Sequence, residues 1–167
     1  SADLTTVRNK IFTPGQICKI IGRNYGYANL LYLLQNFDIL FIKLKSAGTI
    51  TQALSDDSDL RGIQSALEHF DVLTEYGFTP AQIVTMAAFQ ESIRTVVRNL
   101  SELNRGLESL FGINGEKKKK TDYIVKLASG KRGPDRIAEF VKNTPKIEQK
   151  SNQDVKKSTE LASSADA

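Results

Sequence analysis

A spacing of 33 residues recurs along the chain, and it limits the possible folds more than any other feature of the sequence. Residues 12–17 read Phe-Thr-Pro-Gly-Gln-Ile, and residues 78–83, which lie 66 positions later, read Phe-Thr-Pro-Ala-Gln-Ile. The same pattern also recurs at half that distance, because Phe-Asp-Ile-Leu at 37–40 returns as Phe-Asp-Val-Leu at 70–73. A period of this length is typical of two-helix repeats, which stack on one another to bury their apolar faces.

Apolar residues keep the spacing through three copies, and a fourth copy follows an insertion. The matched sets are Ile17, Ile50 and Ile83; Leu30, Ile63 and Val96; and Leu34, Leu67 and Leu100. In the fourth copy, Ile124 and Ile137 lie 41 residues after Ile83 and Val96, which places an insertion of eight residues around 112–120. The sequence therefore predicts repeats at 12–44, 45–77, 78–118 and 119–148.

The repeats have the residues that begin and continue helices. At 13–16 and at 79–82, a threonine suits the N-cap, a proline suits the first helical position, and a glutamine completes a capping box. A longer helix with a broad apolar stripe is expected to follow, from Leu30 to Leu44 in the first copy. No segment has convincing strand alternation. The predicted fold is an all-α superhelical solenoid of about four two-helix repeats of roughly 33 residues.

The segments that flank the repeats are expected to have separate roles. We expect residues 1–11 to form an N-terminal capping segment. We expect the polar, serine-rich residues 149–167 to form a tail of frayed helix followed by disorder. No apolar run has the length of a membrane span, and no secretory signal is evident. The expected assembly state is a monomer.

Composition restricts the classes of function. The net charge of +4 favours an anionic partner such as nucleic acid or an acidic protein. Cys18 is the single cysteine, so the chain forms no internal disulfide and no thiolate zinc site, and we expect this side chain to pack in the core. The single histidine, His69, is expected at a helix surface or in packing. With no nucleophile–base pair evident, we expect neither an enzyme nor a bound metal or cofactor.

Several segments resemble the TAL-effector-like DNA-binding repeat proteins. Residues 78–88 (FTPAQIVTMAA) are similar to the start of such a repeat, and residues 124–133 (IVKLASGKRG) are similar to its first helix and variable loop. Residues 12–34 resemble a whole helix-loop-helix core, and Pro145 falls where the family often has a kinking proline. The resemblance covers about residues 12–148, and it implies a right-handed superhelix that binds double-stranded DNA.

The resemblance also implies which residues face DNA. In the family, the loop between the helices faces the major groove, and the second residue of a variable pair meets a base edge. The aligned pairs are Arg23-Asn24, Asp56-Asp57, Phe89-Gln90 and Gly130-Lys131. The loop and base-facing residues would then be Arg23, Asn24, Asp57, Gln90 and Lys131. These side chains can read base edges, although polar residues also populate loops without any such role.

Further basic residues are candidates for contacts to the DNA backbone. The candidates are Arg132 and the run Lys117, Lys118, Lys119 and Lys120. The lysine run could contact phosphates, form part of a nuclear localisation signal, or be a solvated flexible loop. Tyr25 and Tyr27 flank Gly26, and they could stack on bases or pack across a repeat junction.

The sequence departs from the family pattern in its loops. The family usually has a glycine pair there, whereas Gly26 and Gly133 each retain one glycine, and the second copy has the acidic segment 56–59. Acidic side chains next to phosphate weaken binding. The second hypothesis is therefore a protein-interaction scaffold or effector adaptor of the same fold. Because the family is typically bacterial, the resemblance implies the bacterial cytoplasm, or secretion into a host cell and its nucleus.

Overall fold

The computed structural model describes residues 11–22, 26–55 and 60–165, which form eleven α-helices and no strand. The helices are α2 (Pro14–Ile21), α3 (Gly26–Gln35), α4 (Phe37–Leu44), α5 (Ala47–Ser55), α6 (Leu60–Glu68), α7 (Phe70–Tyr76), α8 (Pro80–Ala87), α9 (Gln90–Arg98), α10 (Leu100–Phe111), α11 (Lys117–Ala128) and α12 (Gly133–Ala165). The prediction of an all-α fold is confirmed.

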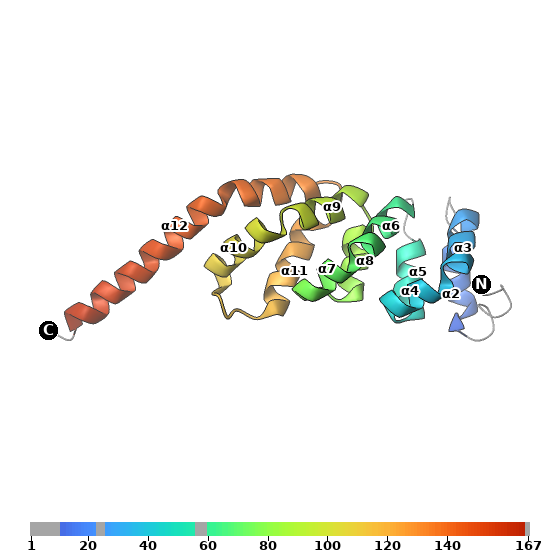
Figure 1. Ribbon diagram of the computed structural model, residues 1–167, viewed down its shortest axis with the longest axis horizontal. Coiled ribbons are helices and arrows are strands. Elements are labelled where there is room, and N and C mark those ends of the chain that lie inside the picture. The colour runs from blue at the N-terminus through green and yellow to red at the C-terminus, as the bar shows by residue number, and fades with distance from the viewer. Residues whose placement is uncertain (1–10, 23–25, 56–59, 166–167) are drawn as a thin grey trace.

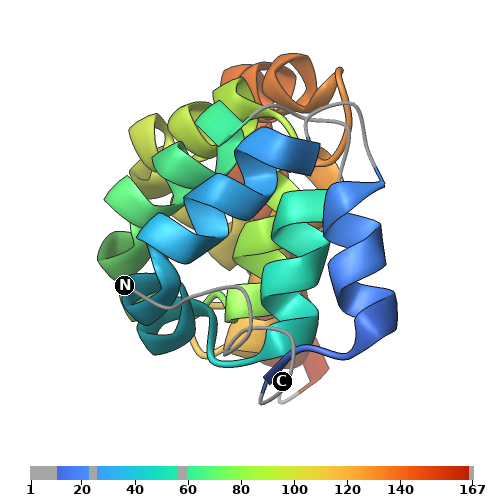
Figure 2. The same ribbon diagram turned by 90° about the vertical axis from the view of Figure 1, so that its right-hand side faces the viewer.

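The helices form hairpins that lie side by side along the long axis of the molecule (Figure 1). In each hairpin, a first helix (α2, α5, α8 or α11) runs in one direction and the following helices return (Figure 1). We call the edge where the first helices begin the lower edge. The upper edge is where they end, and it includes the connections 88–89 and 129–132. Helix α2 packs on α5, α5 on α8 and α8 on α11, so successive hairpins lie one behind another in the end-on view (Figure 2).

The predicted capping boxes are present at the first turns of α2 and α8. The Thr13 hydroxyl accepts from the Gln16 amide nitrogen at 3.2 Å, and Gln16 Oε1 accepts from the Thr13 amide nitrogen at 3.0 Å. Thr79 and Gln82 form the same pair at 3.2 and 2.9 Å. Each box satisfies two amide groups that lack a partner within the helix, so these helices begin where the sequence predicts.

The long second helix of the first three hairpins is broken where the sequence predicts a continuous helix. The breaks fall at Asn36, His69 and Asn99. The Asn36 and Asn99 amides donate to the carbonyl oxygens of Tyr32 and Thr95, four residues earlier, at 2.9 and 2.8 Å. A side chain bonded in this way competes with the regular helical ladder. His69 therefore lies at a turn between two helices and not within one.

The third hairpin is shorter than the 33-residue spacing predicts. Its break at Asn99 follows His69 by 30 residues, because α8 and its connection to α9 together span three residues fewer than α5 and its connection to α6. Counted from the breaks, the fully buried residues Leu40, Leu73 and Leu103 occupy the same place. The predicted match of Leu100 with Leu34 and Leu67 is therefore wrong, since Leu100 immediately follows its break.

One apolar core runs through the stacked hairpins. Its largest fully buried side chains are Ile20, Leu33, Leu40, Leu44, Ile50, Leu54, Leu73, Ile83, Met86, Ile93, Leu103 and Leu107. Burial of one such side chain contributes about 1.5–3 kcal/mol. Helices of only seven to twelve residues are marginal in isolation, so this shared core is what stabilises most of them.

Neighbouring hairpins approach closely at one recurring position. A Cβ atom on Gly62 would lie 1.9 Å from the carbonyl oxygen of Ala87, at the end of the next first helix. Asn29, which lies 33 residues earlier and is 2% exposed, donates its side-chain amide to the carbonyl oxygen of Leu54. Only a missing or a hydrogen-bonding side chain suits such a contact, because a buried carbonyl end must be either approached directly or satisfied.

The C-terminal part differs from the expected loop and tail. The lysine run lies on the first turn of α11 and not in a loop. Helix α12 continues to Ala165, where the sequence predicts a frayed and partly disordered tail. This helix changes direction along its length (Figure 1), and it contains Pro145, a residue type that kinks helices because it cannot donate the backbone hydrogen bond. Cys18 is exposed, so its expected place in the core is wrong.

Candidate nucleic-acid interface and an adjoining pocket

The connection 129–132, between α11 and α12, is the best-ordered basic loop at the upper edge. Arg136 holds its shape, because its guanidinium donates to the carbonyl oxygens of Leu127, at 2.9 Å, and of Ser129. Gly130 has φ +82°, a left-handed conformation that favours glycine. Gly133 lets α12 start close to α11, since a Cβ there would lie 2.0 Å from the Ala128 carbonyl oxygen.

Lys131 and Arg132 extend from this fixed loop into solvent. Both side chains are exposed, and within residues 11–22, 26–55 and 60–165 neither forms an ion pair or a hydrogen bond. Their charges are therefore free to meet an anion. Arginine forms bidentate hydrogen bonds to phosphate or to guanine, and lysine contacts either one as a compact charge.

Gln90 is the other described candidate for a base contact, and it is less available. It is the first residue of α9 and is half-buried. Its side-chain oxygen accepts from the Arg94 guanidinium at 2.8 and 3.0 Å when the amide is turned to satisfy both groups. Arg94 also lies 3.4 Å from the Glu91 carboxylate. A base contact by Gln90 would have to replace the hydrogen bonds to Arg94.

The remaining upper-edge candidates are not placed. Arg23, Asn24 and Asp57 lie outside the described residues, as does Tyr25. Tyr27 is described and is 82% exposed, so it does not pack across a hairpin junction. Of the two roles left open for Tyr27, stacking on a partner is the one that its exposure permits.

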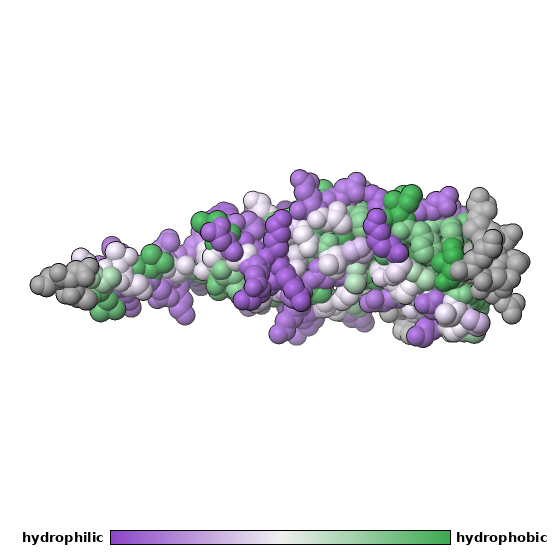
Figure 3. Space-filling model, turned by 90° about the horizontal axis from the view of Figure 1, so that it is seen from below, coloured by the Kyte–Doolittle hydropathy of each residue, from purple (hydrophilic) through white to green (hydrophobic). Residues whose placement is uncertain are grey.

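The lysine run lies at the other end of α11 from Lys131 and Arg132. The helix has 12 residues, which at 1.5 Å per residue separates the two basic groups by about 18 Å. Lys117, Lys118 and Lys119 are exposed, whereas Lys120 is 7% exposed. On the lower face, hydrophilic side chains gather over the middle of the molecule and hydrophobic ones lie toward the N-terminal end (Figure 3). The basic residues therefore form two separate groups.

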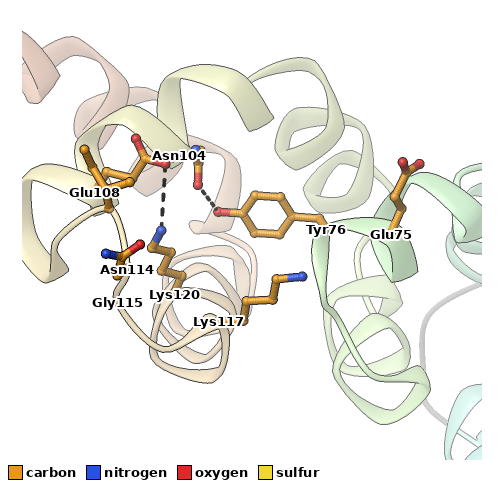
Figure 4. Close-up of a pocket in the computed structure, with 9 residues that line it drawn as sticks. Glu75, Tyr76, Asn104, Glu108, Asn114, Gly115, Lys117 and Lys120 are labelled. Atoms are coloured by element: carbon orange, nitrogen blue, oxygen red, sulfur yellow. Dashed lines mark hydrogen bonds and ion pairs between the residues drawn. The ribbon is translucent and has the colours of Figure 1, made fainter.

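A pocket of about 510 Å³ lies beside the lysine run, between the end of α7, α10, the connection 112–116 and the start of α11 (Figure 4). A chain of polar contacts forms one wall. The Tyr76 hydroxyl donates to Asn104 Oδ1 at 3.0 Å, and Asn104 Nδ2 donates to Glu108 Oε1 at 2.9 Å. The Lys120 ammonium lies 3.9 Å from the same Glu108 oxygen.

The tyrosine in this chain stays protonated over the physiological pH range. Burial, and then the nearby charge of Glu108, raise the pKa of Tyr76 from 10.0 to about 12. Its hydroxyl is therefore a hydrogen-bond donor and not a base. Sequence reasoning missed this group, since Tyr76 and Asn104 are 28 residues apart and only the insertion at 112–120 marks the place.

Two classes of site are absent from the described part of the chain. No group of three or more His, Cys, Asp or Glu side chains there lies close enough to hold a metal ion. Among the described helices, none has the length and apolar character needed to cross a membrane.

Comparisons with protein-family models, with curated proteins and with solved structures find no match to this chain. Its function is therefore argued from its own residues.

Proposed function

We propose that the four hairpins are repeats of one right-handed superhelical solenoid, as in the TAL-effector-like proteins that the sequence resembles. Three observations support this proposal. The first helices pack on one another in chain order. Breaks recur at Asn36, His69 and Asn99. The contact of Asn29 with the next first helix has its counterpart at Gly62. Nearest-neighbour packing of this kind defines solenoids.

The proposed function is binding of double-stranded DNA along the upper edge, without catalysis. The observation that carries it is the loop 129–132, where Arg136 and two glycines hold exposed Lys131 and Arg132 in a fixed shape. Because an ordered loop loses little conformational freedom on binding, its cations are suited to contact a regular array of phosphates. The net charge of +4 also favours such a partner.

Within this proposal, the candidate residues have different roles. Arg132 contacts the DNA backbone, and Lys131 contacts either the backbone or a guanine edge. Gln90 reads a base only after it releases Arg94. The exposed lysines of the lower edge, Lys117 to Lys119, contribute long-range attraction and no direct contact. Lys120 is left out because it is buried beside Glu108.

The proposal is tested by a duplex-DNA titration followed by fluorescence anisotropy at two salt concentrations. Binding should weaken steeply between about 50 and 200 mM salt, since each phosphate contact releases counterions. The absence of binding at the lower salt concentration would contradict the function and leave the helical fold as described.

The alternative function is a protein-interaction scaffold, and one observation favours it. Ile39 and Val72 occupy the same place after successive breaks and are 43% and 47% exposed, and Ile42 beside them is 65% exposed. Clustered exposed apolar side chains mark protein-binding surfaces. Under this alternative, Ile42→Lys and Val72→Lys would abolish partner binding. Under the DNA proposal, both variants should bind duplex as the unmodified chain does.

A further inference from the structure

The pocket beside the lysine run has no role in the proposed DNA interface, because it faces the lower edge. Its volume of about 510 Å³ lies within the range of small-molecule sites. The connection 112–116 forms part of its wall, through Ile113, Asn114 and Gly115. The pocket is therefore built where the fourth hairpin departs from the others, and insertions of this kind often carry function.

The buried lysine of the pocket lacks hydrogen-bond acceptors. The Lys120 side chain is 9% exposed, and its ammonium has three donors. Among the described residues it makes no hydrogen bond, and the nearest carboxylate oxygen is Glu108 Oε1 at 3.9 Å. That oxygen already accepts from Asn104. A buried ammonium is costly unless it is both paired and hydrogen-bonded, so the pocket presents an incomplete acceptor set.

The charges that face the pocket leave a net charge of about +1. Lys117, one helical turn before Lys120, reaches toward the same hollow, and Glu108 supplies one negative charge (Figure 4). Glu75 also borders the pocket, but its carboxylate points away from the other labelled groups (Figure 4). A ligand with a single negative charge would complete this balance, whereas a dianion would be repelled by Glu108.

We propose that this pocket binds a small molecule that carries one carboxylate. The carboxylate oxygens accept from the Lys120 and Lys117 ammonium groups, and Asn114 lies near enough in the pocket lining to contribute a further donor. The Tyr76 ring and the Ile113 side chain give the ligand an apolar surface. The ligand class is thus a compact aromatic or aliphatic monocarboxylic acid. This site is independent of the DNA-binding proposal.

The test is a titration of the full chain, labelled with nitrogen-15, with benzoate, phenylacetate and hexanoate, followed by NMR. At least one acid should cause saturable shifts of the Asn104 side-chain amide, and sodium chloride at the same ionic strength should not. Lys120→Met keeps the length of the side chain and removes its charge, so it should weaken binding about tenfold or more. Lys119→Met is the matched control, since Lys119 is exposed and does not line the pocket.

Clear outcomes overturn the proposal. Shifts that do not saturate with any of the three acids would do so, as would equal weakening by Lys119→Met and Lys120→Met. Tighter binding of inorganic phosphate than of every acid would overturn the ligand class. If Lys120→Met does not fold, Lys117→Met serves in its place, because Lys117 is exposed. That variant should weaken binding of the acid, and unchanged affinity would contradict the site.

Discussion

The two ends of α11 both carry basic residues, but the structure uses them differently. At the upper end, Lys131 and Arg132 project from a four-residue connection and are exposed. At the lower end, the four lysines form the first turn of the helix, which turns Lys120 inward toward Glu108. The comparison shows that a count of basic residues does not locate the charge that is available to a partner. The backbone conformation at each end decides it.

The two ends are also held by different contacts. The upper connection depends on Gly133 and on the bonds from Arg136 to backbone carbonyls. The lower end is held by side chains of another hairpin, since Gln82 Nε2 donates to Asp122 Oδ1 at 2.8 Å and to Thr121 Oγ1 at 3.3 Å. We therefore expect the upper end to be sensitive to backbone crowding and the lower end to the loss of single polar groups.

The largest effect is expected from Gly133→Ala. The new Cβ would lie 2.0 Å from the Ala128 carbonyl oxygen and 2.9 Å from the Ser92 hydroxyl, so α12 must shift. We expect the free energy of unfolding to fall by about 3 kcal/mol, measured by chemical denaturation. Gly48→Ala is the control, because its Cβ would meet only the Ser46 hydroxyl at 3.9 Å. It should stabilise the chain by about 0.5–1 kcal/mol, and equal losses in both variants would contradict the close approach at Gly133.

The second prediction concerns DNA affinity. The double variant Lys131→Ala/Arg132→Ala should weaken duplex binding about tenfold or more at physiological salt. It should also reduce the slope of log affinity against log salt by about 2, since two phosphate contacts are lost. Lys117→Ala/Lys119→Ala removes the same charge from the lower edge and should have a smaller effect. Fluorescence anisotropy measures both variants, and a larger loss from the lower-edge variant would reverse the comparison.

The third prediction compares two capping glutamines. Gln16 and Gln82 both complete a capping box, but only Gln82 also bonds to α11. Gln82→Ala should therefore reduce the free energy of unfolding by about 1 kcal/mol more than Gln16→Ala, the value of the additional hydrogen bonds. Thermal or denaturant unfolding of the two variants gives the difference. Identical losses would show that the contact between α8 and α11 adds no stability.

The smallest effect is expected at high pH. Because the pKa of Tyr76 is raised to about 12 in the folded chain, from 10.0 otherwise, folding favours the protonated phenol. That contribution is complete below pH 10 and is lost as the pH rises from about 10 to about 12. Tyr76→Phe should reduce the fall in stability over this interval. Tyr27→Phe, at a side chain that is 82% exposed, should leave the fall as it is in the unmodified chain.

The sequence predicts the elements whose causes are local. The capping boxes at Thr13 and Thr79 rest on residues three positions apart, so composition and spacing identify them. The buried Ile17, Ile50 and Ile83 keep the 33-residue spacing because each lies on a first helix that packs against its neighbours. The all-α fold follows from the same periodicity.

The features that the sequence does not predict depend on contacts between hairpins. The break at Asn99 lies three residues from its expected position, because α8 and its connection are shorter, and no local residue marks that change. Lys120 looks like its neighbours in a run of lysines, and only the approach of Glu108 from α10 distinguishes it. The pocket likewise brings Tyr76 together with Asn104 across 28 residues.

The central claim, that DNA lies along the upper edge, is tested most directly by cross-linking from one residue at each edge. In a Cys18→Ser background, Asp135→Cys and Glu116→Cys each replace one exposed acidic residue, at the start of α12 and just before α11. Both cysteines carry the same photo-reactive group. The account predicts that duplex DNA cross-links to position 135 and only weakly to position 116. Cross-linking that is equal at the two positions, or stronger at 116, would contradict it.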